Sequence, residues 1–121
     1  MDLDVEGLMA VLDSMPDIVF AKDLDGRYIA GNTAWSRLLG VAKAAAIGRL
    51  DADLFPPDLA AEFRRNDLAM LATSQAQRNE EWVTFPDGRR AILETLKSPL
   101  RDGSGEVIGL VGVCREIPSP R

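Results

Sequence analysis

Side chains that carry catalytic chemistry are sparse in this chain. Its 121 residues include one cysteine, Cys114, and no histidine. Nucleophilic Ser–His and Cys–His pairs are therefore excluded, and so are zinc and haem sites that depend on histidine ligands. The pairs Asp51/Asp53 and Asp23/Asp25 place carboxylates close together, but neither continues into a complete EF-hand loop. We predict no metal site and no catalytic residue, and we do not expect an enzyme.

Lys97 is the most unusual charged residue, because it lies in a predicted strand over residues 90–97. Its neighbours on the same face of that strand are small or apolar. A lysine that points into the protein needs a partner, and the candidates are Asp67, Glu81 or an anionic ligand. The interpretation that the pattern favours is a solvent-exposed or intra-sheet ion pair. Lys22, in the first predicted strand, leaves the same choice open.

Large apolar side chains form a second group of candidates. Ligand pockets are lined mainly by such residues, with a few polar groups that orient the ligand. Candidate polar groups are Lys97 and Asn32, although Asn32 is also a typical N-cap for the helix that follows it. A filled core is the interpretation that these spacings favour. The apolar residues that could line a cavity are Phe20, Tyr28, Trp35, Phe55, Phe63 and Met70.

Overall charge and hydrophobicity limit the expected partners. The formal net charge is −5, whereas a nucleic-acid surface needs clustered Lys and Arg, so no nucleic-acid partner is expected. No apolar run approaches the ~20 residues of a membrane helix, so no direct membrane contact is expected. A lone cysteine suits a reducing compartment, which predicts a cytoplasmic domain, even where the parent protein is anchored in a membrane.

Turn residues and periodicity divide the chain into short elements. Asp25-Gly26 between two apolar runs predicts a hairpin, and Gly40 is suited to end the helix that Asn32 begins. The expected order is a helix over 3–14, strands over 18–22 and 27–30, a helix over 33–39, short helical turns and loop over 41–58, a long helix to about residue 74, and strands over 77–84, 90–97 and 106–117.

This arrangement resembles the PAS family of sensory domains over residues 8–117. The resemblance rests on three stretches: 12–40, with its Asp-Gly turn, Asn and closing Gly; 46–63, with Ile-Gly and Phe-Pro pairs; and 79–117, which is similar to the closing PAC strands. It implies an α+β fold with a five-stranded antiparallel sheet in the order 2-1-5-4-3. Short helices cover one face of that sheet, and an N-terminal helix precedes it.

The resemblance also bears on cofactors. In this family the hollow between sheet and helices can hold a small molecule, haem or flavin. Photosensors that form a cysteinyl-flavin adduct carry the cysteine on a helix, but Cys114 falls on the last predicted strand. Because histidine is absent, His-ligated haem is not expected either. Non-covalent flavin remains open, and the identity of any ligand is unknown.

The function that follows from the resemblance is sensory signal transduction. We expect a domain that binds a small ligand, or relays a conformational change, to the output domain of a bacterial histidine kinase or cyclic-di-GMP enzyme. The alternative is a ligand-free module for dimerisation and relay. Residues 1–15 are assigned to a dimerisation helix, 16–117 to the PAS domain and 118–121 to a disordered tail. A homodimer is expected, with an interface through Leu8, Val11 and Leu12.

Overall fold

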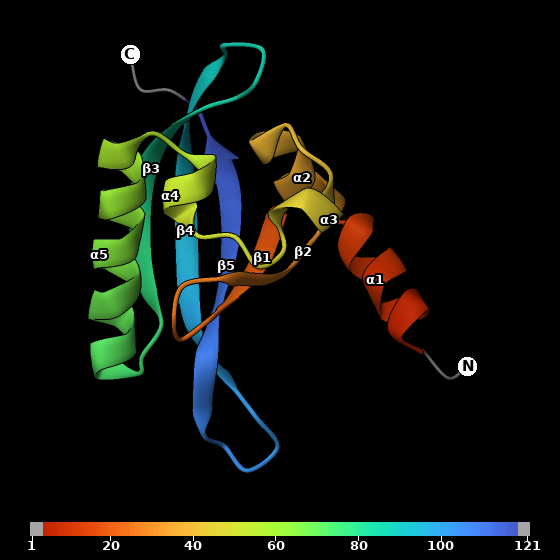
Figure 1. Ribbon diagram of the computed structural model, residues 1–121, viewed down its shortest axis with the longest axis vertical. Coiled ribbons are helices and arrows are strands. Elements are labelled where there is room, and N and C mark those ends of the chain that lie inside the picture. Colours follow the sequence, from red (N-terminus) through yellow and green to blue (C-terminus); the bar gives the residue numbers. More distant parts are fainter. Residues whose placement is uncertain (1–3, 119–121) are drawn as a thin grey trace.

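A five-stranded antiparallel sheet forms the centre of the computed structural model, which describes residues 4–118 (Figure 1). The elements are α1 (Val5–Asp13), β1 (Ile18–Asp23), β2 (Tyr28–Gly31), α2 (Thr33–Leu39), α3 (Lys43–Ala46), α4 (Asp51–Leu54), α5 (Pro57–Thr73), β3 (Gln77–Thr84), β4 (Arg90–Arg101) and β5 (Val107–Ile117). The predicted α+β class is confirmed.

The strands lie in the order β2-β1-β5-β4-β3, as predicted. Short turns join β1 to β2, β3 to β4 and β4 to β5, so sequential strands pair antiparallel. The first and last strands meet in the middle of the sheet, where Phe20 is opposite Gly112. The two halves of the chain are therefore joined through β1 and β5.

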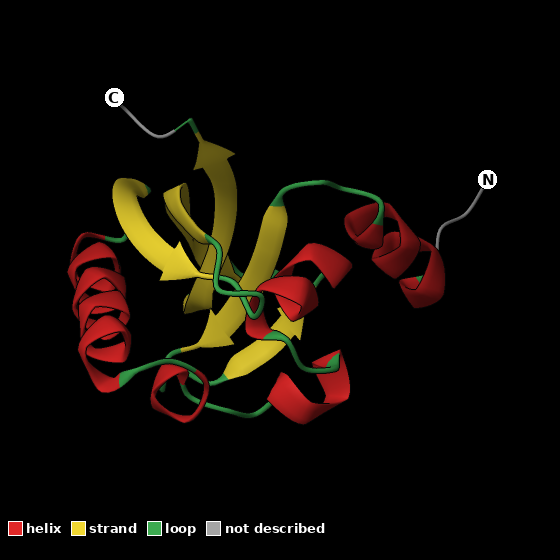
Figure 2. Ribbon diagram, turned by 90° about the horizontal axis from the view of Figure 1, so that it is seen from above, coloured by secondary structure: helices red, strands yellow, loops and turns green. Residues whose placement is uncertain are grey.

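Helices α2 to α5 lie on one face of the sheet (Figure 2). The core between them contains Phe20, Tyr28 and Trp35 from the first half of the chain, and Phe63 and Met70 from α5. Helix α1 is different. It projects from the body beside α2, and none of its residues is buried (Figure 1).

Two glycines allow large rings to lie directly on the sheet. A Cβ built on Gly112 would lie 2.2 Å from Cζ of Phe20, and one on Gly31 would lie 2.0 Å from Cε3 of Trp35. Neither position has space for a side chain.

Element ends differ little from the sequence-based expectation, except in β4. This strand continues to Arg101 instead of ending near Lys97. Strand β3 pairs with β4 only as far as Lys97, so Pro99 lies on a section of β4 with a free edge. A residue without an N–H is tolerated there.

Segment 41–58, expected to form short helical turns and loop, contains the four-residue helices α3 and α4. Residues 1–3 and 119–121 are outside the described part of the chain, and with them most of the tail that was predicted to be disordered. No helix within residues 4–118 is both long and apolar enough to cross a membrane.

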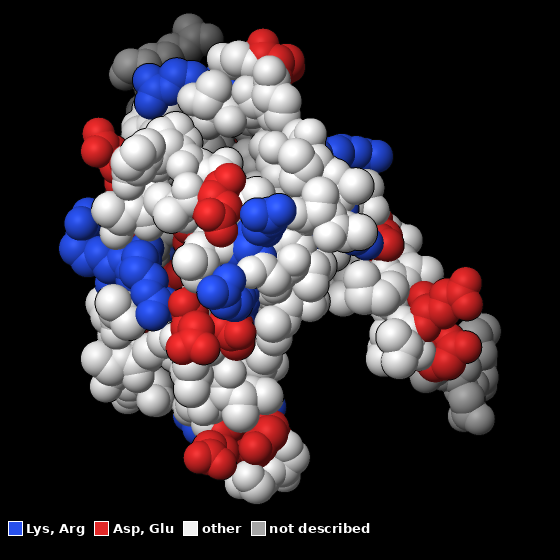
Figure 3. All heavy atoms as spheres, in the orientation of Figure 1, with Lys and Arg blue, Asp and Glu red and all other residues white. Residues whose placement is uncertain are grey.

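Charged side chains are unevenly distributed over the face in Figure 3. Acidic groups gather on α1, which carries Asp4 and Glu6, and at the tip of the β4–β5 hairpin, which carries Asp102 and Glu106. All four side chains are exposed. Other acidic groups lie among basic groups on the body of the molecule, so the negative charge is not confined to these two projections (Figure 3).

Candidate functional site

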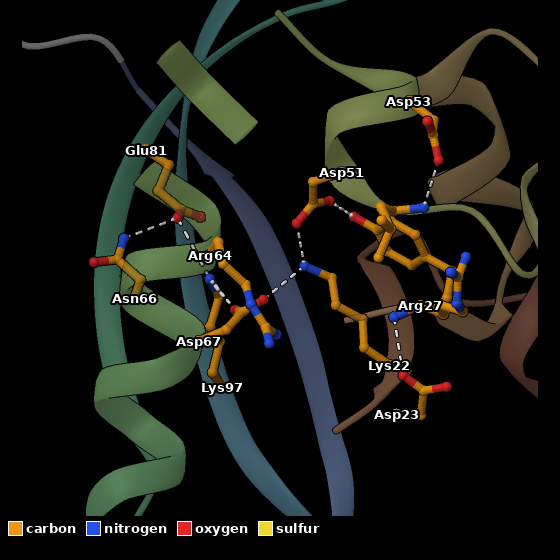
Figure 4. Close-up of polar contacts among 12 residues, drawn as sticks. Lys22, Asp23, Arg27, Asp51, Asp53, Arg64, Asn66, Asp67, Glu81 and Lys97 are labelled. Atoms are coloured by element: carbon orange, nitrogen blue, oxygen red, sulfur yellow. Dashed lines mark hydrogen bonds and ion pairs between the residues drawn. The ribbon is translucent and has the colours of Figure 1, made fainter. Parts of the chain in front are cut away.

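Five charged side chains meet between the sheet and the helices, and we name them the ion cluster (Figure 4). They come from five different elements, and none is more than 7% exposed. A group of buried charges of this size is uncommon, because each charge loses its hydration and needs compensation from its neighbours. The members of the ion cluster are Lys22, Asp51, Asp67, Glu81 and Lys97.

Lys22 reaches from β1 toward the helices. Its Nζ lies 2.5 Å from Oδ2 of Asp51 on α4 and 2.7 Å from Oδ2 of Asp67 on α5. The hydroxyl of Tyr28 donates to the other oxygen of Asp51 over 2.5 Å. Asp51 therefore joins the helical segment to both strands of the first hairpin.

Lys97 reaches the same helix from β4. Its Nζ lies 2.8 Å from Oδ1 of Asp67 and 3.6 Å from Oε2 of Glu81 on β3. Asn66 on α5 donates to the same oxygen of Glu81 over 3.3 Å. Asp67 and Glu81 were the two carboxylates that the sequence suggested as alternative partners of Lys97, and both lie beside it. Asp67 lies between the two lysines.

Both lysines are buried, which corrects the solvent-exposed part of the interpretation favoured from the sequence, whereas the pair of Lys97 with Glu81 lies within the sheet, as that interpretation allowed. Lys97 is 2% exposed and Lys22 is 1% exposed, so neither forms a solvated ion pair. The reason is their position. Strands β1 and β4 are interior strands of the sheet, and α5 and α4 cover the face to which these side chains point. The alternation of residues along a strand shows which side chains share a face of the sheet, but it does not show which helices cover that face.

The environment keeps the polar groups in defined protonation states. Burial alone would lower the pKa of Lys97, but the charges of Asp67 and Glu81 outweigh burial and raise that pKa, so the side chain remains a cation. Burial, together with the charge of Asp51, raises the pKa of Tyr28 well above its usual value. Tyr28 is therefore a neutral hydrogen-bond donor at physiological pH.

An aromatic cavity adjoins the ion cluster, and we name it the inner cavity. Its volume is about 30 Å³, which accommodates about two water molecules. Lys22, Glu81 and Lys97 form the polar part of its wall. The ammonium of Lys22 lies 4.9 Å from the ring centre of Tyr28, and that of Lys97 lies 5.7 Å from the ring centre of Phe63. Such distances are favourable for cation–π contacts.

A larger hollow lies outside this cavity, and we name it the outer groove. It has a volume of about 530 Å³ and runs between the end of α2, the start of α5 and the β3–β4 hairpin. Phe55 and Leu38 line both the outer groove and the inner cavity. These two side chains are the partition between the two spaces.

Most of the predicted cavity residues meet at one place. Those that line the inner cavity are Phe20, Tyr28, Trp35, Phe55, Phe63 and Lys97. Met70 is buried in the core and does not line this cavity. A role in binding a ligand stays a prediction for each of these residues.

Asn32 also lies away from the inner cavity, because its amide group has other partners. Its Oδ1 accepts from the backbone N–H of Trp35 over 3.0 Å and of Val19 over 3.1 Å. Its Nδ2 donates to the carbonyls of Leu12 and Asp17. The predicted N-cap role is confirmed, and the amide also holds the connection between α1 and β1.

The residues predicted to form a dimer interface are placed on α1. Leu8 and Val11 are 52% and 54% exposed, whereas Leu12 is half-buried. Their role in dimerisation stays a prediction.

Asp51 is the site residue that sequence reasoning missed. Its carboxylate was considered only together with Asp53 as a calcium ligand, whereas it pairs with Lys22. The signal that could have found Asp51 was Lys22. A lysine on an interior strand can be buried, and a buried cation requires a carboxylate from another part of the chain. Cys114, which lies on the last strand as expected, is buried beside Thr95, and burial raises the pKa of its thiol to about 11.

Curated relatives of this chain are signalling proteins. The aerobic respiration control sensor protein ArcB of Escherichia coli is 32% identical over 110 residues, which are 91% of this chain and 14% of ArcB. The methanogenesis regulatory histidine kinase FilI of Methanothrix harundinacea is 28% identical over 88% of this chain and 12% of that protein. A diguanylate cyclase of Vibrio cholerae is 29% identical over 88% of this chain and 34% of the cyclase.

The chain thus spans only a small part of the length of these relatives, and the shared part has a sensory role in signal transduction. Among solved structures, the VqmA–ligand–DNA complex of Vibrio cholerae superposes with a TM-score of 0.85 at 25% identity. The match covers 95% of this chain and 52% of the VqmA chain.

That DNA complex corrects one expectation. The negative net charge led us to expect no nucleic-acid partner. That expectation is wrong, because a domain of this fold occurs in a receptor bound to DNA. The net charge of one domain does not limit what the rest of a longer protein contacts, and nearly half of the VqmA chain is outside the match.

A family model confirms the resemblance noted in the sequence. The model described as the PAS fold matches residues 12–121, which include every strand of the sheet. The strand order and the position of the helices agree with that fold. The chain therefore belongs to the PAS-fold family.

Proposed function

We propose that this PAS domain binds a small molecule between its sheet and helices and transmits the resulting change to an output domain of a longer protein. The observation that carries the proposal is the position of the ion cluster on the wall of the inner cavity. Two buried lysines and a buried glutamate face an otherwise aromatic space. Ligand sites have this composition, with a few converging polar groups among apolar walls.

The ion cluster also provides a route for the signal. It connects β1, β3 and β4 to α4 and α5 through four ion pairs. A ligand that contacts Lys22 or Lys97 changes the balance among these pairs, and this favours one arrangement of helices over another. A ligand shifts such an equilibrium only by its difference in affinity for the two arrangements.

The domain itself is proposed to be regulatory and not catalytic. The names of the relatives support a parent protein that is a histidine kinase, as in a two-component system, or a diguanylate cyclase. A cytoplasmic location is proposed with it, supported by a single thiol, Cys114, that is buried and free.

A homodimer through α1 is proposed as the assembly. Residues 1–15 would form the dimerisation segment, and within its described part Val5, Leu8 and Val11 are exposed apolar side chains. Exposed apolar rows of this kind mark protein contacts. Leu8→Asp should convert the dimer to a monomer in light-scattering measurements, whereas Glu6→Gln on the same helix should leave the mass unchanged. Equal masses for wild type and Leu8→Asp would refute this interface.

Ligand binding is tested on the purified chain. We expect native mass spectra to contain an adduct of small-molecule mass that denaturing spectra lack, and a chromophoric ligand would add an absorbance band. A dimer without any adduct would favour the second candidate, a ligand-free relay domain. The small volume of the inner cavity, about 30 Å³, supports that alternative.

A further inference from the structure

The polar wall of the inner cavity has unused hydrogen-bond donors. An ammonium has three N–H groups, and residues 4–118 supply Lys22 with two acceptors, Asp51 and Asp67. Lys97 has two carboxylates within ion-pair distance, but its Nζ makes no hydrogen bond of good geometry within the described chain. The indole N–H of Trp35 is also buried without an acceptor there. Each of these three side chains lines the inner cavity.

The same wall has an acceptor. Glu81 lines the inner cavity and is 4% exposed; within residues 4–118 its Oε2 accepts from Asn66 and lies 3.6 Å from Nζ of Lys97. A ligand at this wall therefore meets donors beside an acceptor. The group that matches both at once has a carbonyl next to an N–H, as an amide or lactam does.

Charge favours an uncharged ligand. With the acids ionised and the lysines protonated, the two lysines and three carboxylates of the ion cluster leave one excess negative charge. Both ammonium groups already have carboxylate partners, so an anionic ligand would bring a further uncompensated charge into a buried site. A cationic ligand would lie against two lysines on the cavity wall.

The rings and the volumes indicate the shape of the ligand and its route. Phe20, Tyr28 and Trp35 line the inner cavity. Tyr28 packs edge-on against Phe20 and at an angle against Trp35, with ring centres 5.6 and 5.1 Å apart, and aromatic side chains of this kind favour contact with a ring. About 30 Å³ is too small for a ring, but about 530 Å³ lies beyond Phe55. Phe55 is in the extended connection between α4 and α5 and is half-buried.

We propose that the site takes a small, planar, uncharged ring with a carbonyl beside an N–H, and that the side chain of Phe55 moves into the outer groove to admit it. The polar edge of the ligand contacts Lys97 and Glu81, and its ring occupies the space that Phe55 leaves. This inference rests on the proposed function and specifies the ligand class of the same site.

The test uses four probes of similar size with the full chain: 2-pyridone, benzoate, benzylamine and benzene. We expect 2-pyridone to bind most tightly and to raise the melting temperature most. Phe55→Ala opens the partition in advance and should tighten 2-pyridone binding by about tenfold, since it removes the cost of displacing the ring. Leu68→Ala is the control for truncating an apolar side chain, because Leu68 is exposed on α5 and lines neither space, and it should bind as wild type does.

A second variant tests the charge argument. Glu81→Gln removes the excess negative charge with little change of shape, so benzoate should gain about tenfold in affinity. If Phe55→Ala does not fold, as judged by circular dichroism, Phe55→Leu replaces it.

Benzoate or benzylamine binding to wild type as tightly as 2-pyridone would overturn the ligand class, and so would a folded Phe55 variant that binds none of the four. A native-mass adduct of another chemical class would overturn it too, but would leave the ligand-binding function in place.

Discussion

Asp67 is the residue on which the ion cluster depends most. One carboxylate oxygen pairs with Lys22 and the other with Lys97, and the side chain is fully buried. The helix α5 thereby contacts two interior strands through one residue. Its loss leaves two buried ammonium groups with fewer partners, which is the most costly way to disturb buried ions.

Asp67→Ala should therefore lower the free energy of unfolding by about 3–5 kcal/mol, a large share of the stability of a domain of this size. Glu94→Ala is the matched control. It also removes an ion pair, with Arg78, but that pair is exposed, and the change should be within about 1 kcal/mol. Urea unfolding followed by circular dichroism measures both values. Equal losses for the two variants would mean that burial does not set the strength of these pairs.

Cys114 should be unreactive in the folded protein. Burial raises the pKa of its thiol from 9.0 to about 11, and the thiolate is the reactive form. Near pH 8 the thiolate population should be about 100-fold smaller in the folded than in the unfolded chain, and reaction with a thiol reagent should slow at least as much. The control is the same protein in urea. Similar rates in the two conditions would show that Cys114 is accessible.

At the scale of elements, Asn32 connects three parts of the fold. Its side chain caps α2 and also binds the backbone of β1 and the segment after α1. Asn32→Ala removes a cap and leaves buried backbone groups without partners, so unfolding should become easier by about 2–4 kcal/mol.

Asp4→Ala is the comparison for Asn32→Ala. Asp4 caps α1, which has no buried residue, and its loss should change global stability by less than about 0.5 kcal/mol. Chemical denaturation distinguishes the two variants. A small effect of Asn32→Ala would mean that the cap and the connection contribute little to the fold.

The elements were largely predictable from the sequence because each has local markers. Asn32 and Gly40 bound α2, and Asp25-Gly26 marks the first hairpin. The exception, β4, continues through Pro99, since the length of a strand depends on where its neighbours end. That information is not local, and a proline rule applied to the sequence alone ends the strand too early.

The site was predictable only in part, for the same reason. Strand alternation places Lys97 on one face, but the burial of that face depends on α5, whose contacts are distant in sequence. Asp51 is the first residue of a helix of four residues and has no local pattern that relates it to Lys22, 29 residues earlier. Which charges pair across the core depends on how the elements pack. The sequence alone therefore gives only a list of possible partners.

At the scale of the whole molecule, titratable groups predict how stability depends on pH. The pKa of Asp13 is lowered by its hydrogen bond with Lys43, and that of Asp102 by its hydrogen bond with Ser104. Each carboxylate binds its proton less readily in the folded than in the unfolded chain. Their contribution is present above the unfolded value of 3.8 and is lost as the pH falls through the lowered values.

On the alkaline side, Cys114 should dominate the loss of stability. The unfolded chain releases the thiol proton near pH 9.0, whereas the folded chain retains it until about pH 11. Between these values the folded state binds more protons, so stability should fall with rising pH by about 1.4 kcal/mol per unit. Lys97, whose pKa is raised above 10.5, adds a further loss as the pH rises through its folded value.

Urea unfolding at several pH values between neutral and 10.5 measures this slope. Cys114→Ala should be less stable than wild type, but its free energy of unfolding should fall less steeply as the pH rises, because the thiol that titrates is gone. The comparison depends on slopes and not on absolute stabilities, so the cavity that the substitution leaves does not disturb it. An identical slope in wild type and Cys114→Ala would assign the alkaline loss to Lys97 and Tyr28 instead, and would show that the thiol is more accessible than its buried position implies.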